Sequence, residues 1–420
     1  MDRGQTNFFI KLGIINLCIV AAVGVLMRYK IGFEFPFFDQ KHLLYAHLHF
    51  AFVGWVSHVL YTLMVAFLHD YHIKSPSFIQ LIRANLICAY SMLISFTIQG
   101  YGLISIIFTA LSILVGYIFA YQYFTALKTL PREHPSKNWF KAAVLFNVLS
   151  SLATFYLVYM MATNNIQQHA YLGSVYFYLH FQYSGWFFFA IMGLLMAKLK
   201  ESNTFSDNSK IFKTFFVACI PGYFLSILWA DLPWYLFIFP VVAIILQLWG
   251  LYMFLYCLKK NLLYIKANWS YHVQWLFSLA LVALIIKLAL QAGSIFPEIS
   301  KLAFGFRSIV IAYLHLVLLG FTTIFLLGYI LLCNYISNGR AALLALVLFS
   351  VGVFANELVL MVQGVASFGY ILIPYLNETL FLVSVFMLFS LLLFLWLCYI
   401  KSIIMFIFVN ENIRNTNPDR

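Results

Sequence analysis

Three histidines stand in a short pattern that occurs three times along the chain. The pattern is His or Tyr, Leu, His, four further residues, Gly, and then an aromatic residue. The copies are His47-Leu48-His49 with Gly54, Tyr178-Leu179-His180 with Gly185, and Tyr313-Leu314-His315 with Gly320. The last histidines of successive copies are 131 and 135 residues apart, close to a third of the 420 residues. This repetition predicts three tandem units, each with one imidazole at an equivalent position.

Imidazole is the commonest metal ligand in proteins, and two imidazoles facing each other across a helix bundle can hold a haem iron from both sides. The alternative is that each imidazole makes an ordinary hydrogen bond between helices. Three such groups in equivalent positions favour the ligand interpretation, because ionisable residues inside membranes are costly. Gly54 and Gly320 would let either a flat macrocycle or a neighbouring helix approach closely. His47 and His49 point about 200° apart on a helix, so they serve different sides.

Other ionisable residues lie far inside apolar segments. Lys287 and Glu357 are two of them, and a buried charge must pair, face water or become neutral. The sequence therefore offers two partners for Lys287, namely the carboxylate of Glu357 or a haem propionate. Arg307 could also meet a propionate, although its place near a helix end favours snorkelling to the membrane surface.

The composition excludes a soluble globular protein. Hydrophobic residues make up 64% of the chain and charged residues 9%, and the mean hydropathy is +0.93, so a lipid bilayer is the expected partner. The formal charge of +12 is interpreted as membrane orientation signals, since no Lys/Arg cluster is dense enough for nucleic acid. The six cysteines lie in or beside apolar runs without a CxxC motif and are interpreted as small buried hydrophobic residues.

Hydropathy predicts an all-α polytopic membrane protein with about twelve spans in a single membrane domain, 1–420. Each span is long enough to cross about 30 Å of hydrocarbon, and the first is expected to be retained rather than cleaved as a signal peptide. The predicted spans are 8–27, 43–68, 78–98, 101–127, 139–162, 169–198, 211–230, 234–258, 268–293, 303–333, 341–363 and 377–409.

Lys and Arg are concentrated in the loops that follow even-numbered spans, which predicts that both termini are cytoplasmic. Spans 2, 6 and 10 then start at the outer surface, and their motif histidines lie at similar depth, roughly 9–18 Å from the outer helix ends. The chain is thus expected to contain three pseudo-symmetric four-helix repeats, about 1–135, 136–265 and 266–412, around a pseudo-threefold axis.

Twelve spans with histidines on the second, sixth and tenth resemble subunit I of haem–copper oxidases, and more closely the nitric-oxide reductase large subunit. His47-Leu48-His49 with Gly54 is similar to the family's His-x-His-(four)-Gly signature, which the family carries on helix 10. Residues 180–193 are similar to the reductase helix-6 segment, with Ser184 where the reductase has Glu. The chain departs from the family at Tyr313, where the family has a histidine, and in 211–230, which contains no histidine.

The resemblance implies a low-spin, bis-histidine haem of b type held by His49, or His47, together with His315. A second haem would use Tyr313 or His47 as its ligand, since a phenolate can ligate haem. A non-haem metal at His180 lacks further ligands, because such sites need three or more. The dinuclear centre of the family is therefore expected to be incomplete.

The function expected from the resemblance is electron transfer or diatomic-gas chemistry in the respiratory chain of a bacterial inner membrane. An electron-donor protein or a partner subunit is the expected protein partner. Enzyme status stays open, and an enzyme would be an oxidoreductase of the terminal oxidase or nitric-oxide reductase type. Two other classes fit the sequence. One is a small-solute transporter or channel lined by Lys287, Glu357 and the histidines, and the other is a haem-free structural or assembly protein on the same scaffold.

Overall fold

The computed structural model describes residues 1–73, 77–202, 209–230, 232–336 and 339–400. These residues form helices and connecting turns, with no strand among them. Eleven helices in this part of the chain are long and apolar enough to cross a membrane, which confirms the prediction of an all-helical integral membrane protein.

The first part of the chain contains α1 (Arg3–Gly32), α2 (Gln40–His49), η1 (Phe50–Ser57), α3 (His58–Asp70), α4 (Ser77–Gln99), α5 (Leu103–Ala126) and η2 (Leu127–Thr129). The middle part contains α6 (Pro135–Ala162), α7 (Gln168–His180), η3 (Phe181–Phe187), α8 (Phe188–Leu199), α9 (Ser209–Cys219), η4 (Pro221–Ser226), η5 (Leu228–Ala230), η6 (Trp234–Phe237), α10 (Ile238–Lys260) and α11 (Leu262–Asn268). The last part contains α12 (Tyr271–Gly293), α13 (Pro297–Gly305), α14 (Arg307–His315), η7 (Leu316–Thr323), α15 (Ile324–Leu332), α16 (Arg340–Phe368), α17 (Leu376–Leu395) and η8 (Trp396–Ile400).

The predicted span at 211–230 is not one continuous helix. The α-helix α9 ends at Cys219, and the 3₁₀ turns η4 and η5 follow it. Pro221 explains the break, because its ring has no N–H to donate and clashes with the preceding turn of an α-helix. The predicted last span, 377–409, is described as far as Ile400 as α17 and η8, and its remainder lies outside the described residues.

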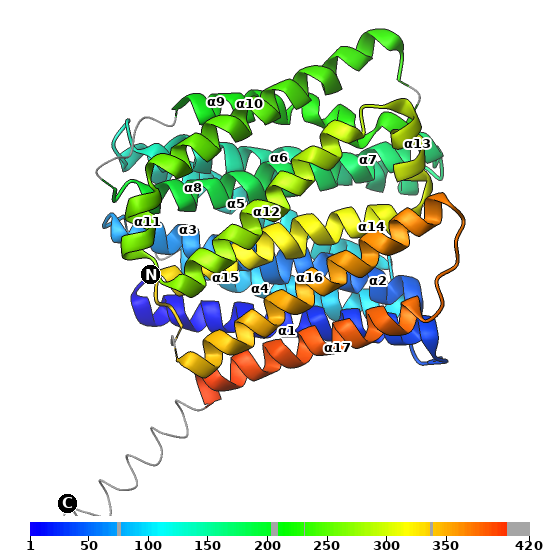
Figure 1. The fold of residues 1–420 in the computed structure, drawn as a ribbon, viewed down its shortest axis with the longest axis horizontal. Helices are drawn as coiled ribbons and strands as arrows, with labels where there is room; N and C mark the ends of the chain where they lie inside the picture. Colours follow the sequence, from blue (N-terminus) through cyan, green and yellow to red (C-terminus); the bar gives the residue numbers. More distant parts are fainter. Residues whose placement is uncertain (74–76, 203–208, 231, 337–338, 401–420) are drawn as a thin grey trace, which may run out of the picture.

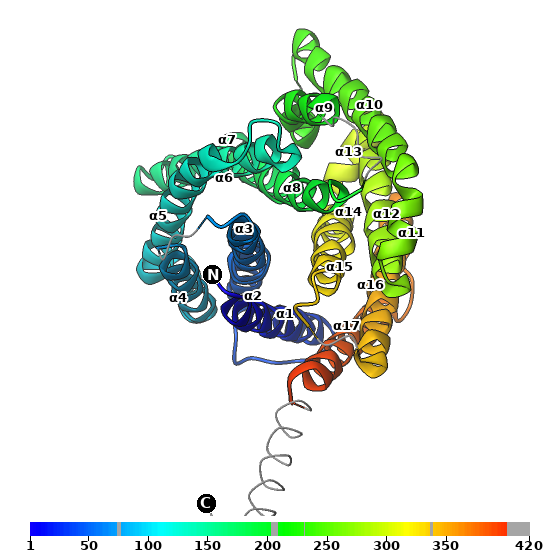
Figure 2. The same cartoon turned by 90° about the vertical axis from the view of Figure 1, so that its left-hand side faces the viewer.

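The long helices run side by side, and the N-terminus lies at the same end of the bundle as the end of α17 (Figure 1). Figure 2, which looks along the helices, shows α3, α8 and α15 near the middle, with the other helices around them. Each of these three helices continues a span that starts at the opposite end of the bundle, through α2, α7 and α14 respectively. These three spans are called the inner spans below.

Each inner span changes from α-helix to π-helix directly after its motif histidine. The π-helices are η1, η3 and η7, and they follow His49, His180 and His315. A π-helix carries one extra residue in the turn, so it alters which carbonyls are paired within the helix. It also turns the following residues to a different side of the bundle.

Side chains bond the carbonyl groups of these π-helices. In η1, the Asn85 amide donates to the Val53 carbonyl at 3.0 Å and the Asn16 amide donates to the Gly54 carbonyl at 2.5 Å. In η7, the hydroxyls of two threonines donate to carbonyls five residues earlier in the chain, at 2.9 and 2.8 Å. A bilayer core supplies no water for unpaired backbone groups, so these side chains stabilise the π-helices by donating hydrogen bonds to their carbonyls.

Hydrogen bonds between tryptophans and hydroxyls join the inner spans. The Trp55 indole N–H donates to Thr323 Oγ1 at 2.9 Å, which links η1 to η7. The Trp186 indole N–H donates to Ser57 Oγ at 3.1 Å, which links η3 to η1. In both pairs the donor stands six positions after a motif histidine, and the acceptor stands eight positions after another motif histidine.

The third contact of this kind is apolar and involves the same two positions. The rings of Phe321 and Phe188 have centroids 6.2 Å apart and join η7 to α8. The first inner span thus contacts the third, the second contacts the first, and the third contacts the second. These three contacts between spans form a closed cycle, which is called the aromatic ring below. Each contact joins the sixth residue after one motif histidine to the eighth residue after another.

Ser57→Ala tests the aromatic ring, because it leaves the buried Trp186 indole N–H without an acceptor. We expect the free energy of unfolding to fall by about 1–3 kcal/mol, measured by denaturant titration in detergent micelles. The double variant Ser57→Ala, Trp186→Phe removes the orphaned donor, so its loss should be smaller than the sum of the two single losses. Fully additive losses would contradict the proposed coupling.

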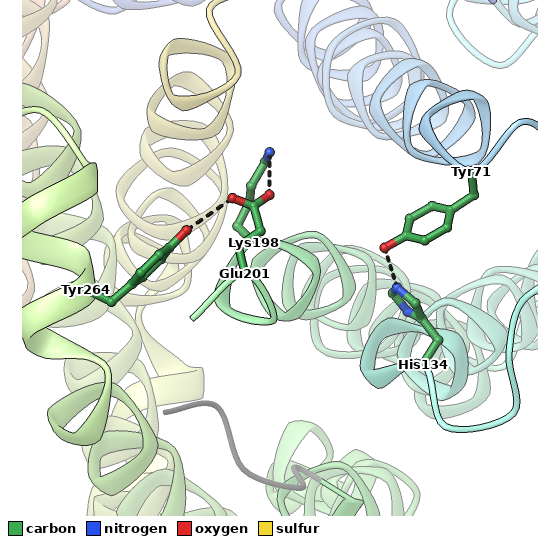
Figure 3. Close-up of polar contacts among 5 residues, drawn as sticks. All are labelled: Tyr71, His134, Lys198, Glu201 and Tyr264. Carbon is green, nitrogen blue, oxygen red and sulfur yellow. Dashed lines mark hydrogen bonds and ion pairs between the residues drawn. The ribbon is translucent and has the colours of Figure 1, made fainter. Parts of the chain in front are cut away.

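Polar contacts join several helices at the end of the bundle that holds the N-terminus (Figure 3). Glu201 accepts from Lys198 at 3.1 Å and from the Tyr264 hydroxyl at 3.1 Å, which ties the end of α8 to α11. His134 Nε2 and the Tyr71 hydroxyl are 2.7 Å apart, which ties α6 to the end of α3. The Lys198–Glu201 ion pair is exposed enough for water to screen it, so its contribution is at most about 1 kcal/mol.

His134 also caps α6, since its Nδ1 accepts from the Ser136 backbone N–H at 3.3 Å. This assigns the ring proton to Nε2, which donates to Tyr71. Burial, with smaller contributions from Lys200 and Lys137, lowers the pKa of His134 from 6.5 to about 4. Protonation would turn the capping nitrogen into a donor that faces the helix N-terminus, so the folded state resists it.

A folded-state pKa below the unfolded value gives stability that is complete above pH 6.5 and is lost as the pH falls toward about 4. We expect His134→Asn to flatten this part of the stability profile, because Asn also caps helices but does not titrate. Denaturant unfolding at a series of pH values measures the slope. The matched control is His169→Asn, at an exposed histidine, which should keep the wild-type slope. An unchanged slope in His134→Asn would refute the assignment of this pH dependence to His134.

Candidate functional site

The two halves of each inner span are buried to very different degrees. In α3, α8 and α15 almost every residue is buried. In α2 and α7 only two residues each are buried, and in α14 none is. The halves that precede the π-helices, α2, α7 and α14, pack chiefly against α4, α6 and α16 respectively. Beyond the π-helices, α3 and α8 pack against each other. The histidines therefore lie where the inner spans are less closely packed together.

His47 and His315 are the two motif histidines that the structure brings together. Their rings are close enough to interact electrostatically, and both also interact with the guanidinium of Arg28 on α1. Gly24, on the same helix as Arg28, faces His47, since a Cβ there would lie 3.4 Å from the ring carbon Cε1. Two imidazoles and one cation from three helices thus lie within electrostatic range of one another.

The nitrogen atoms of these two rings have different partners. His315 Nδ1 donates to the Ile311 carbonyl of its own helix at 2.8 Å, which leaves Nε2 as the nitrogen with a free lone pair. His47 Nδ1 is buried and has no hydrogen-bond partner. A fixed tautomer with a free lone pair is the state in which imidazole binds metals.

His49 points away from this pair. Its ring stacks on Phe96 with centroids 4.3 Å apart and planes 10° apart, and its Nε2 is 3.3 Å from the Tyr101 hydroxyl. Both partners belong to α4 and the segment after it. The predicted divergence of His47 and His49 is therefore confirmed, and His47 rather than His49 is the one that interacts with His315.

His180 makes a hydrogen bond that depends on the break in α9. Its Nε2 donates to the Cys219 carbonyl at 2.8 Å, and its Nδ1 is buried without a partner. Cys219 is the last residue of α9, so its carbonyl has no α-helical partner. A Cβ on Gly222 would lie 3.2 Å from the His180 ring, so the glycine leaves room for this contact.

The described residues contain no group of three or more His, Cys, Asp or Glu side chains that could hold a metal ion. His180 is therefore not part of such a group within that part of the chain. Tyr313, the position expected to ligate a second haem, has a buried hydroxyl without a hydrogen-bond partner. Its ring lies 6.1 Å from that of Tyr183, measured between centroids.

The predicted pair of Lys287 and Glu357 is wrong. The Lys287 ammonium donates to Ser184 Oγ at 3.0 Å, and Glu357 accepts from the side chain of its neighbour Asn356 at 3.1 Å. Arg307 is exposed, as snorkelling predicts. Sequence reasoning singled out Ser184 only as a replaced Glu and did not foresee it as the partner of Lys287.

The motif glycines allow side chains to approach the inner spans. A Cβ on Gly54 would lie 2.7 Å from the Phe50 ring of the same π-helix, and a Cβ on Gly185 would lie 2.6 Å from Phe146 Cβ on the neighbouring α6. At Gly320 the nearest atom is Ala283 Cβ at 3.4 Å, which is ordinary contact. The sequence suggested that the motif glycines admit either a flat macrocycle or a neighbouring helix. At Gly185 and Gly320 the contacts are with side chains of the neighbouring helices α6 and α12.

Two cavities of the described residues lie beside the inner spans and away from the motif histidines. A cavity of about 320 Å³ lies between α8, α10, α11 and α12 and is lined mainly by apolar side chains. A second cavity, of about 440 Å³, lies between α6, α7, η4 and η5. Neither is lined by His47, His180 or His315.

In comparisons with known proteins, no family model matches the chain, and no curated protein matches it significantly in sequence.

Gly185→Ala and Gly320→Ala form a matched pair at equivalent positions of two inner spans. We expect Gly185→Ala to lower the unfolding free energy by about 1–3 kcal/mol, because the new methyl group would overlap Phe146. Gly320→Ala should be tolerated, since alanine fits there and favours the helix. Denaturant unfolding in detergent measures both. Equal effects in the two variants would contradict this packing account.

Proposed function

We propose that the protein is a haem-binding integral membrane protein similar to subunit I of the oxidases and the nitric-oxide reductases, in which His47 and His315 would hold the haem. The observation that carries the proposal is the approach of these two imidazoles from the first and third inner spans, beside Arg28. A haem held by two histidines supplies one-electron transfer. The expected setting is a bacterial inner membrane with a donor protein or partner subunit.

The residues present suit such a group in three ways. His315 holds its proton on Nδ1 through the Ile311 carbonyl, so its Nε2 can ligate. His47 has a buried nitrogen without a partner, which a ligand bond would satisfy. Arg28 would balance the carboxylate of a propionate near the two rings, since guanidinium pairs with carboxylates by two parallel hydrogen bonds.

The less buried halves of the inner spans, α2, α7 and α14, also support the proposal. A haem is a wide, flat, apolar group, so it needs helices that do not pack directly on each other. The helices α2 and α14 carry His47 and His315 and meet this condition, because they pack chiefly on α4 and α16. His49, with its aromatic partners on the other side, is the alternative ligand that the sequence suggested.

The same proposal includes the architecture of three four-helix repeats with both termini cytoplasmic. It is supported by a π-helix after each motif histidine and by the closed aromatic ring at equivalent positions. In this scheme α9, η4 and η5 together make the seventh of twelve crossings, broken at Pro221. Tyr313 and His180 then occupy the place of the family's dinuclear centre without its ligand set, so the familiar route of oxygen reduction is not proposed.

An absorption spectrum of the purified protein tests the haem. We expect a reduced-minus-oxidised Soret and α band in the wild type and its loss in His47→Ala and in His315→Ala, because each removes one axial ligand. His49→Ala is the matched control and should keep the band. Size-exclusion chromatography shows whether each variant is folded. A band that survives in both ligand variants, or no band after haem is supplied, would refute the proposal.

A small-solute carrier is the second candidate function, and one observation favours it. The break at Pro221 exposes a helix-end carbonyl to His180, close to the buried Lys287. Broken helices beside polar residues at membrane depth are typical of transporter binding sites. Uptake of solute by proteoliposomes, together with a flat haem spectrum, would favour this function.

A further inference from the structure

A second polar site lies where α12 packs beside η3, apart from His47 and His315. Lys287 on α12 is 5% exposed, and its ammonium donates to Ser184 Oγ at 3.0 Å. The same ammonium lies 5.9 Å from the centroid of the Tyr183 ring. Lys287 is six residues before the end of α12, which places it about 9 Å inside that helix end. It is thus a cation within the apolar part of the bundle.

No carboxylate of the described residues forms an ion pair with Lys287, since the ion pair found in that part of the chain joins Lys198 and Glu201. An ammonium has three N–H donors, and Ser184 accepts from one of them. The face of the Tyr183 ring offers a further weak attraction. Neither contact offsets a whole positive charge, and an uncompensated ion in hydrocarbon costs several kcal/mol. A negative partner would offset this cost, and loss of the proton is the other way in which a buried lysine avoids it.

Two further side chains, Tyr313 and Gln291, each carry a buried hydrogen-bonding atom without a partner. The Tyr313 hydroxyl is buried and unpartnered, and its ring packs edge-on against Tyr183. Gln291, one helical turn after Lys287 on the same face of α12, has a buried side-chain oxygen without a partner. The Ser184 hydroxyl accepts from Lys287 and keeps its own proton available to donate.

His180 lies beside this group without belonging to its donor set. Its ring is 6.3 Å from that of Tyr183 between centroids, and it interacts electrostatically with Lys287. Its N–H is already donated to the Cys219 carbonyl, so its other nitrogen is an acceptor. The donors that remain are the ammonium of Lys287 and the hydroxyls of Ser184 and Tyr313.

A cavity lies beside Tyr223, which is near His180. The cavity of about 440 Å³ is lined by residues of α6, α7, η4 and η5, and Tyr223 is part of its lining. The Tyr223 ring is also 6.3 Å from the His180 ring, and its hydroxyl donates to the Gly173 carbonyl at 3.1 Å. Tyr223 thus lines the cavity and also lies near His180. A small solute in the cavity would be one side chain away from His180.

We propose that Lys287, Ser184 and Tyr313 form a binding site for a small monovalent anion inside the bundle. One ammonium and two hydroxyl donors match the single charge and the few acceptor atoms of such an ion. The site is independent of the proposed haem ligands, and it would function whether or not haem is bound.

Thermal unfolding of the purified full-length protein in detergent tests the site, with formate and chloride as probes. Total ionic strength is held constant with gluconate, which is too bulky for an enclosed site. A ligand that binds the folded state raises the unfolding temperature as its concentration rises. We expect this rise in the wild type and its loss in Lys287→Met. Ser184→Ala and Tyr313→Phe should each weaken the apparent affinity about tenfold, as expected for loss of one hydrogen bond to a charged group.

Lys287→Met is expected to fold, because replacing an uncompensated buried charge with an apolar side chain of similar volume is often neutral or stabilising. Lys266→Met, at an exposed lysine on α11, is the matched control and should respond like the wild type. No anion-specific rise in the wild type, or an equal rise in Lys287→Met, would overturn the proposal.

A haem carboxylate could supply the same chemistry to Lys287, so the titration is repeated on haem-free and haem-supplied protein. Equal responses support a site for a free anion. A response confined to haem-free protein would assign the ammonium to a haem carboxylate and overturn the free-anion site. Absence of any haem band would refute the proposed haem and leave this test valid.

Discussion

Every backbone N–H and carbonyl inside a bilayer needs a partner, and the three inner spans meet this demand in an unusual way. Each leaves α-helical pairing directly after its motif histidine. The carbonyls of η1 are bonded by Asn85 from α4 and Asn16 from α1, which ties the inner span to two outer helices. The π-helices are therefore stable only within the assembled bundle.

The π-helices also explain why the two halves of each inner span face different neighbours. One extra residue in a turn rotates everything that follows it around the helix axis. Beyond the π-helices, α3 and α8 pack against each other, and the aromatic ring joins all three spans. Before them, α2, α7 and α14 pack on outer helices and carry the histidines. The π-helices thus account both for the close packing of α3 and α8 and for the less closely packed region around His47 and His315.

The break in α9 has a similar double effect on polar groups in the apolar interior. Ending the helix at Cys219 leaves a carbonyl that His180 bonds, and Gly222 leaves the space for the imidazole ring. Lys287 lies close by and is bonded to Ser184. One proline therefore accounts for the free carbonyl that His180 bonds.

Much of the fold followed from the sequence, because hydropathy acts locally along the chain. Long apolar runs predicted the membrane helices, and eleven of them are found in the described residues. The span at 211–230 was predicted as continuous although Pro221 was visible, since the hydropathy of a window does not register a missing N–H. The pairing of Lys287 with Glu357 was wrong because depth along a helix says nothing about the direction in which a side chain points.

The sequence by itself determined that this is a helical membrane protein with one histidine in each of three equivalent motifs. Helical geometry also determined that His47 and His49 face different ways. Only the tertiary structure decided which of them meets His315, because that depends on how α2 is rotated between α1 and α4. The rotation of α2 is set by packing across the whole bundle, with Gly24 beside the His47 ring and Phe96 stacked on the His49 ring. The spacing of the sequence repeat contains no information about this rotation.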